Sequence, residues 1–350
     1  MSPAYVEKDS LLAVDVGSAT TRAMLFDVVA GRYRFIAIGQ SPSTAHAPFR
    51  DISEGVYQAI ENLQKTTGRT FLDKERNIIS TSQSDGSGAD SFAASLSAGA
   101  ALNIVIAGLL TDVSLASTVN LAESTYGRVV ETLSLNDPRS SQEKIDAIIQ
   151  ARPDLILIAG GTDGGATRSL KDILEVIGLA CYLIPQDRRP AVLFAGNQNM
   201  EADVREALGN LTSAIHISSN IRPSVDTEDL QPARKKLAHA VIGIRKNQLQ
   251  GVAALDMRAG GNLLPSAFAE GRLLNFLSNL YGANKAVLSV NLGASATTIS
   301  AGFGDQLSTS IYPHLGMGAG LADLQKYTSL ENISRWLPLD IHPQNLIDYL

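Results

Sequence analysis

Two segments of this 350-residue chain repeat the same pattern of residues. Residues 12–21 read Leu-Ala-Val-Asp-Val-Gly-Ser-Ala-Thr-Thr, and residues 288–298 read Leu-Ser-Val-Asn-Leu-Gly-Ala-Ser-Ala-Thr-Thr, with one inserted alanine. In each segment an apolar run predicts a strand, the glycine predicts a turn, and the residues after the Thr-Thr pair predict a returning strand. The chain is therefore expected to contain the same β-hairpin twice.

The residues of the repeated turn suit phosphate binding. Glycine lets successive backbone N–H groups point outward, and with Ser and Thr hydroxyls they form a nest for anionic oxygens. Asp15 ends its strand two residues before Gly17, where a carboxylate is placed to hold a hydrated Mg²⁺ against a phosphate. Either turn alone is explained as an ordinary Gly-Ser hairpin, but two that face each other would clamp a polyphosphate from both sides.

The rest of the chain favours an α/β fold. Strands are expected at 11–16, 21–29 and 32–40, then a helix at 52–65 and a Ser/Gly-rich loop at 80–91. Apolar strands at 102–107, 155–159, 192–195 and 214–217 alternate with helical patterns at 115–134, 167–177, 200–208 and 229–246, which predicts a parallel sheet. The C-terminal part favours a helix at 266–281, strands at 286–292, 297–302 and 307–312, and a helix after the Gly-rich run 315–320.

A different glycine-rich turn, Gly-Gly-Thr-Asp-Gly-Gly at 160–165, follows the expected strand at 155–159. Ligands of open parallel sheets tend to bind at the carboxyl ends of the strands, so this turn could form an anion nest before a helix. It could equally be a structural turn in which Asp163 caps the helix. The glycine spacing does not fit the dinucleotide-binding fingerprint.

Composition excludes several classes of protein. Hydrophobic residues make up 45% of the chain, and 29 Lys and Arg against 35 Asp and Glu give a net charge of −6. A mildly acidic chain with no dense basic tract is a poor partner for nucleic acid or an anionic membrane. The single cysteine, Cys181, excludes an internal disulfide, and its apolar neighbours predict a core position. The N-terminus lacks the pattern of a secretory signal, and every apolar stretch is shorter than the roughly 18 residues that a membrane span needs. We therefore expect a cytoplasmic protein.

The motifs together resemble those of the MutL/GlmL family. The paired hairpins resemble the phosphate loops of the actin, sugar-kinase and Hsp70 ATPase superfamily. Between them, in family order, lie Gly-Gly-Thr-Asp-Gly-Gly at 160–165, Phe-Ala-Gly-Asn at 194–197, Asn-Ile-Arg-Pro at 220–223 and Leu-Pro at 264–265. The match runs from about residue 11 to 325. Family members are associated with cobalamin-dependent glutamate mutase, so the resemblance implies a chaperone or reactivation factor driven by ATP.

The resemblance implies a role for each matching residue. Asp15 would position Mg²⁺, Asn291 stands where the family carries a catalytic Asp, and Asp163 would reach the interdomain cleft as a water-orienting acid. ATP or ADP would be held by Gly17, Ser18, Ala19, Thr20 and Thr21 of the first loop, and by Gly293, Ala294, Ser295, Ala296, Thr297 and Thr298 of the second.

Two departures from the family pattern affect the expected activity. Asn291, Ala294 and Ser300 replace Asp, Gly and Asp, and because Asn carries no charge we expect nucleotide binding with very slow hydrolysis. On the same ground, Asn291→Asp is expected to raise the rate more than the affinity. About 50 residues follow the second loop, so we expect an incomplete adenosine pocket, or a chain that is a fragment.

The predicted fold is therefore α/β, of the ribonuclease-H-like actin type, with an inserted parallel βα-repeat domain. Residues 1–95 and 251–350 would form the ribonuclease-H-like parts, and 96–250 the inserted domain. The predicted function is ATP binding coupled to domain closure, acting on a cobalamin-dependent mutase. A catalytically inactive nucleotide-binding or interaction protein is the first alternative. A small-molecule kinase with Asp163 as its catalytic acid is the second.

Overall fold

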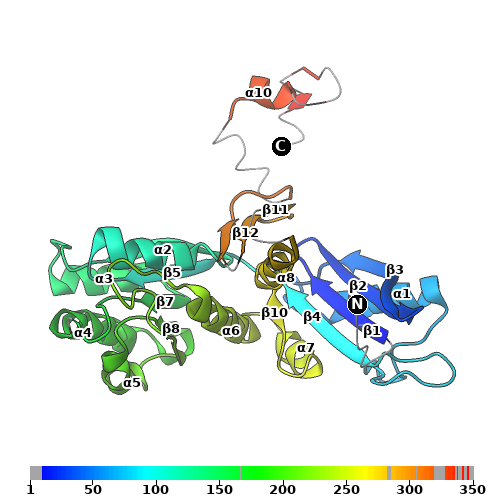
Figure 1. The fold of residues 1–350 in the computed structure, drawn as a ribbon, viewed down its shortest axis with the longest axis horizontal. Helices are drawn as coiled ribbons and strands as arrows, with labels where there is room; N and C mark the ends of the chain where they lie inside the picture. The colour runs from blue at the N-terminus through cyan, green and yellow to red at the C-terminus, as the bar shows by residue number, and fades with distance from the viewer. Residues whose placement is uncertain are drawn as a thin grey trace.

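The computed structural model describes residues 10–165, 167–281, 285–304, 306–318, 328–335, 337, 341–342 and 345–346. Its strands form three sheets, two built on the repeated hairpins and one parallel sheet between them in the sequence. Figure 1 shows the parallel sheet with its helices at one end of the molecule and the N-terminal sheet at the other. Helix α8 and the second hairpin sheet lie between these two parts.

The first sheet has the strand order β10-β4-β1-β2-β3. Antiparallel strands β1 (Ser10–Val16), β2 (Thr20–Val29) and β3 (Arg32–Pro42) are extended by β4 (Ser91–Leu96), parallel to β1, and by β10 (Leu264–Pro265), parallel to β4. Alternate residues of β1 are buried, as the period of two residues requires. Helix α1 (Ser53–Thr67) covers this face with its apolar stripe, so one core forms between the helix and the sheet.

The second sheet is entirely parallel and has the order β6-β5-β7-β8-β9. Its strands are β5 (Leu102–Ala107), β6 (Gly127–Leu133), β7 (Leu155–Ile158), β8 (Ala191–Phe194) and β9 (Ala214–Ile217). The connecting helices are α2 (Ala116–Ala122), α3 (Ser141–Ala151), α4 (Arg168–Leu183), α5 (Glu201–Leu208) and α6 (Gln231–Gln248). A π-helical turn at Thr111–Leu115 leads into α2, and 3₁₀ turns lie at Gln186–Arg188 and Gln198–Met200. Separate apolar clusters form on the two faces of the sheet, as expected for parallel strands covered by helices. Cys181 lies in one of them, and burial raises the pKa of its thiol to about 12.

The third sheet repeats the first hairpin. Antiparallel strands β11 (Ala286–Leu292), β12 (Thr297–Phe303) and β13 (Gln306–Tyr312) pack against α8 (Ser266–Tyr281), and α10 (Leu330–Ser334) follows. One difference separates the two copies. Leu12 and Val14 of β1 are 0% and 2% exposed, whereas the matching Leu288 and Val290 of β11 are 68% and 54% exposed.

Helix α6 joins the inserted sheet to the first one. Its residues Leu237 and Val241 belong to the core of the parallel sheet, whereas Ile242 belongs to the core of the first sheet, which α7 (Val252–Arg258) also enters. Arg245 is 3% exposed at this junction and donates a hydrogen bond to the carbonyl of Ala100. Burial lowers the pKa of Arg245 to about 10.

The expected α/β class, with a parallel βα repeat inserted between two hairpin units, is confirmed. The expected helix at 115–134 is wrong beyond residue 122, because the chain there turns into edge strand β6. A Cβ on Gly127 would lie 2.4 Å from the Ile104 side chain, so glycine allows the two strands to approach. The sequence also did not predict β4 or α3, and the helix expected after the Gly-rich run 315–320 lies outside the described residues.

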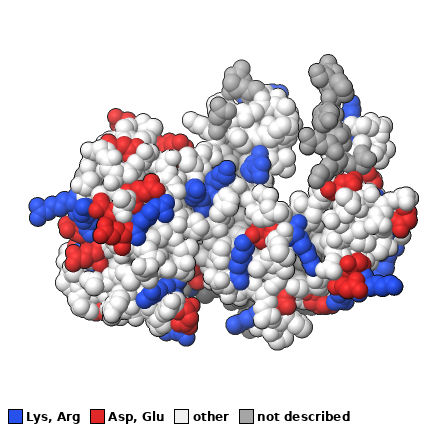
Figure 2. Space-filling view, turned by 90° about the horizontal axis from the view of Figure 1, so that it is seen from below, with Lys and Arg blue, Asp and Glu red and all other residues white. Residues whose placement is uncertain are grey.

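Side chains of both charges share the surface. On the face drawn in Figure 2, Lys and Arg lie among Asp and Glu, and several basic side chains gather over the middle of the molecule. Among the described residues, no helix has the length and apolar character needed to cross a membrane.

Candidate functional site

The two repeated turns face each other in the structure. Ser18 Oγ and Ser295 Oγ lie 2.7 Å apart and share a hydrogen bond. Each turn is closed in the same way, by a hydrogen bond from the glycine N–H to the carbonyl oxygen three residues further along the chain. These bonds are Gly17 N to Thr20 O at 3.0 Å and Gly293 N to Ala296 O at 2.9 Å. The sequence repeat is therefore also a repeat of backbone geometry.

Both glycines are required by close contact inside the turn. A Cβ on Gly17 would lie 2.8 Å from the Thr20 carbonyl oxygen, and one on Gly293 would lie 2.9 Å from that of Ala296. At the tip of each turn, the backbone N–H groups of residues 18, 19, 294 and 295 donate no hydrogen bond within the described part of the chain. Four N–H groups thus remain available to an external acceptor.

A cleft of about 410 Å³ lies between the turns. Most of the predicted loop residues line it: Asp15, Gly17, Ser18, Ala19, Thr20, Asn291, Gly293, Ala294, Ser295, Ala296 and Thr298. Two predicted residues do not. Thr21 is 1% exposed in β2, and Thr297 donates to the Leu315 carbonyl at 2.8 Å.

Asp15 is held in position by two serine residues from other elements. Its Oδ1 accepts hydrogen bonds from Ser95 Oγ of β4 at 2.6 Å and from Ser266 Oγ of α8 at 2.9 Å. Its Oδ2 faces Arg22 at 3.7 Å, a long contact with a half-exposed guanidinium. One carboxylate oxygen is thus fixed, and the other keeps coordinating capacity on the cleft side.

Asn291 has a carboxylate neighbour that the sequence did not reveal. Its Nδ2 donates to Glu270 Oε2 of α8 at 3.1 Å, and Ser289 donates a hydrogen bond to the other carboxylate oxygen. Ser266 and Glu270 are one helical turn apart, so α8 directs one toward β1 and the other toward β11. The negative charge missing from position 291 is present next to it.

Tyr126 connects the edge of the parallel sheet to α8 and to the second hairpin sheet at the cleft. The residue lies just before β6 in the chain. Its hydroxyl accepts a hydrogen bond from the Ala267 N–H in the first turn of α8 at 3.1 Å and is also hydrogen-bonded to Thr298 of β12. Burial raises its pKa to about 12. The tyrosine therefore stays neutral at any ordinary pH and serves as a fixed hydrogen-bonding group.

We predict that Tyr126→Phe lowers the free energy of unfolding by about 1–3 kcal/mol. The change keeps the ring but leaves the Ala267 N–H and the Thr298 hydroxyl without their buried partner. Urea unfolding followed by circular dichroism measures the effect. Tyr182→Phe, at a side chain that is 66% exposed on α4, is the control and should change stability little. Equal effects of the two substitutions would contradict the role assigned to Tyr126.

Asp163 lies apart from this cleft. It is not among the lining residues, and its Oδ1 accepts hydrogen bonds from the Gln198 N–H at 3.2 Å and from Asn220 Nδ2 at 3.0 Å. The Asp163 side chain thus ties together the loops that follow β7, β8 and β9. The structure does not bring it to the cleft as the family resemblance implied.

The Gly-rich segment after β13 packs against the second turn. Met317 N donates to the Gly293 carbonyl at 2.9 Å and Gly318 N to the Ala294 carbonyl at 2.7 Å. A Cβ on Gly316 would lie 2.4 Å from the same Ala294 oxygen, so only glycine allows this approach. Residues 317 and 318 consequently form part of the cleft wall.

Comparison with known proteins identifies the family. The MutL protein family model matches residues 11–342. Protein MutL of Clostridium tetanomorphum is 22% identical over 262 residues, which cover 75% of this chain and 50% of that protein, so the chain spans about half the length of this curated relative.

Similarity to solved structures is remote. A Ppx/GppA family member from Aquifex aeolicus is 11% identical over 93% of this chain and 58% of its own, with a TM-score of 0.22. A glycerol dehydratase reactivase is 16% identical over 45% of this chain and 28% of its own, with a TM-score of 0.15. Neither score supports an argument, whereas the family match covers nearly the whole sequence and confirms the resemblance seen in the motifs. The chain belongs to the MutL protein family.

Proposed function

We propose that the chain binds Mg²⁺ with ATP or ADP in the cleft between its two hairpin turns, and that it is a slow ATPase. It would act as a chaperone or reactivation factor. The observation that carries the proposal is the pairing of two turns of the same geometry across the cleft, joined by the Ser18–Ser295 contact of 2.7 Å. Two such turns offer donors to a chain of phosphates from both sides.

The residues at the cleft fit a nucleotide with its metal. The unused N–H groups at both turn tips and the two serine hydroxyls are donors for phosphate oxygens, which would replace the serine–serine bond. Asp15 Oδ2 is the carboxylate oxygen available to Mg²⁺, because Ser95 and Ser266 already occupy Oδ1. Bound Mg²⁺ would neutralise phosphate charge, while the protein fixes the position of both groups.

Slow turnover follows from the second half of the site. Asn291 is neutral, and Glu270 already accepts hydrogen bonds from Asn291 and Ser289. Neither group is a free carboxylate able to orient an attacking water. The same observation favours the alternative, a catalytically inactive nucleotide-binding or interaction protein. The kinase alternative lacks support, because its acid, Asp163, does not line the cleft.

The partner is proposed from the family alone. Members of the MutL/GlmL family are associated with a cobalamin-dependent mutase, and we infer that this chain acts on an enzyme of that kind. Closure of the cleft around a nucleotide would move the two hairpin units relative to the inserted parallel sheet. Such a domain movement would change the affinity of the chain for a partner protein.

We predict that saturating Mg-ATP or Mg-ADP raises the melting temperature of the chain. Ligand at a hundred times its Kd stabilises the native state by about 2.7 kcal/mol. Asp15→Asn keeps the acceptor for Ser95 and Ser266 but removes the charge, so the shift should become smaller and independent of Mg²⁺. Asp187→Asn, at a side chain that is 79% exposed, is the matched control. An unmoved melting temperature in the wild type would refute nucleotide binding.

A further inference from the structure

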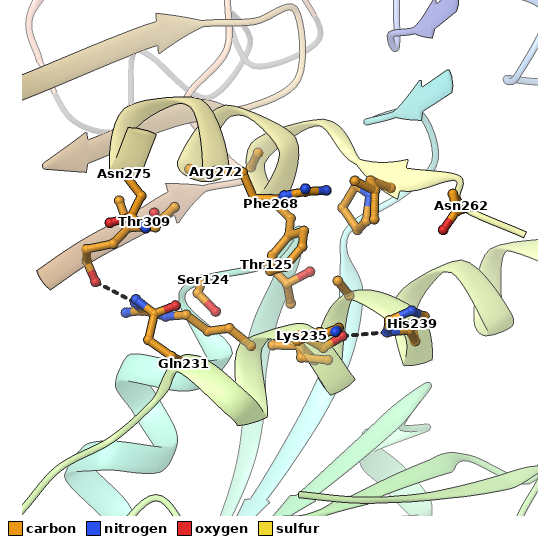
Figure 3. A pocket seen from close by; sticks show the side chains of 18 residues that line it. Ser124, Thr125, Gln231, Lys235, His239, Asn262, Phe268, Arg272, Asn275 and Thr309 are labelled. Carbon is orange, nitrogen blue, oxygen red and sulfur yellow. Dashed lines mark hydrogen bonds between the residues drawn. The ribbon is translucent and has the colours of Figure 1, made fainter. Parts of the chain in front are cut away.

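Helix α8 also lines a second cavity, which shares no residue with the hairpin cleft. This cavity has a volume of about 420 Å³ and lies between α8 and α6, with Thr125 and Thr309 contributing from the sides. Figure 3 shows Phe268, Arg272 and Asn275 of α8 facing Gln231 and Lys235 of α6 across it. Its size is that of a small-molecule site.

The charged side chains at this cavity are all basic. Arg234, Lys235 and Arg272 line it, and no Asp or Glu is among the lining residues. In the part of the chain that the structure describes, none of the three forms an ion pair. Glu228 and Asp229 act on Arg234 from outside the lining, so the cavity wall itself presents three cations and no carboxylate to an anion that enters it.

Three buried polar atoms of this cavity have no hydrogen-bond partner. They are Arg234 Nε, Thr125 Oγ1 and Asn275 Oδ1, half of the six such side-chain atoms found among the described residues. Arg234 is only 8% exposed, and its NH1 donates to the Leu307 carbonyl, which leaves the Nε–H unused. A buried guanidinium hydrogen that meets no acceptor is costly, so its environment favours an anionic acceptor from outside the chain.

The remaining lining groups define the rest of the ligand. Asn275 Oδ1 is an acceptor that requires a donor, whereas Leu264, Pro265 and Phe268 supply an apolar wall. We propose that this cavity binds a small organic anion that also carries a hydroxyl group. The acid group accepts hydrogen bonds from Arg234 and Arg272, and the hydroxyl donates to Asn275. Carboxylate and phosphate share this chemistry.

This site does not rest on the proposed nucleotide function. The two sites adjoin but share no lining residue: Ser266 and Tyr126 line the cleft, whereas their chain neighbours Ala267 and Thr125 line the cavity. Binding of an anion here can therefore be measured with no nucleotide present. Failure of one site leaves the other unaffected.

The test compares four anions at constant ionic strength by thermal shift and titration calorimetry. L-malate and glycerol 3-phosphate carry the hydroxyl group, whereas succinate and inorganic phosphate are their counterparts without the carbon-bound hydroxyl. We expect at least one of the first two to bind saturably, raising the melting temperature by a few degrees, and to bind at least tenfold more tightly than its counterpart. Which of the two binds distinguishes a carboxylate site from a phosphate site.

Two variants locate the binding. Arg272→Gln, at an exposed residue, should weaken binding at least tenfold, whereas Lys236→Gln, at an exposed α6 residue outside the cavity, should leave it unchanged. Asn275→Leu should remove the preference for the hydroxyl-bearing anion. Absence of saturable binding by all four anions would overturn the proposal. Equal binding to the wild type and to Arg272→Gln, or no preference for the hydroxyl, would overturn it as well.

Discussion

Gly39→Ala is expected to destabilise the chain by about 3 kcal/mol or more. Gly39 lies in β3 directly under α1, where a Cβ would lie 2.1 Å from the Ala59 carbonyl oxygen and 2.3 Å from the Leu63 nitrogen. Both are backbone atoms of α1, and they can move away from the new Cβ only if the whole helix moves. Helix α1 would have to lift away from the sheet, although Ile60 and Leu63 are fully buried there. Urea unfolding with circular dichroism measures the loss.

Gly243→Ala is the matched control. Gly243 lies within α6, and a Cβ there would have no neighbour within 4 Å. Alanine is the better helix former, so this substitution should be neutral or stabilise the chain by up to about 1 kcal/mol. Equal effects of the two substitutions would show that α1 does not pack against β3 as closely as described.

Elements with a strong local pattern could be predicted from the sequence. The strands at 11–16 and 286–292 and the helix at 266–281 lie where expected, because each combines an apolar run or stripe with glycine at a turn. Strand β4 was missed because it follows the Ser/Gly-rich loop and is fixed by parallel pairing with β1, which is distant in sequence. Strand β6 was read as helix because it directly follows α2, with only the turn before Gly127 to separate them.

The paired turns were predictable, but their surroundings were not. The repeated Ser-Ala-Thr-Thr after a glycine indicated two phosphate loops, but a sequence pattern does not show whether the two loops lie close together. In the structure they are in contact through Ser18 and Ser295. The groups that tune the site come from elsewhere in the chain: Ser95, Tyr126, Ser266 and Glu270. No short motif connects Glu270 with Asn291, because their contact depends on how α8 crosses β11.

Glu270 bears on the expectation that Asn291→Asp raises the rate more than the affinity. Asn291→Asp was expected to restore the missing charge, but in the structure it would place a second carboxylate beside Glu270, where the present contact is 3.1 Å. Two carboxylates at this distance repel, so the pKa of one of them rises. The folded state then retains a proton that the unfolded state has lost, and stability falls as the pH rises. We expect the variant to be less stable than the wild type at pH 8, by about 1–3 kcal/mol, and to approach it near pH 5.

The double substitution Asn291→Asp with Glu270→Gln should avoid this repulsion. The hydrogen bond between positions 270 and 291 is kept with its direction reversed, because the amide introduced at position 270 would donate to the new carboxylate at position 291. The single negative charge thereby moves from α8 to the cleft wall. The family pattern has an Asp at position 291, so the double substitution restores the charge of that pattern. ATP turnover should therefore rise about 10–100-fold over the wild type, with the affinity for Mg-ATP changed much less. Glu270→Gln alone, which removes the charge altogether, should not increase turnover. A fast wild-type ATPase that is insensitive to both positions would show that the hairpin cleft is not where hydrolysis occurs.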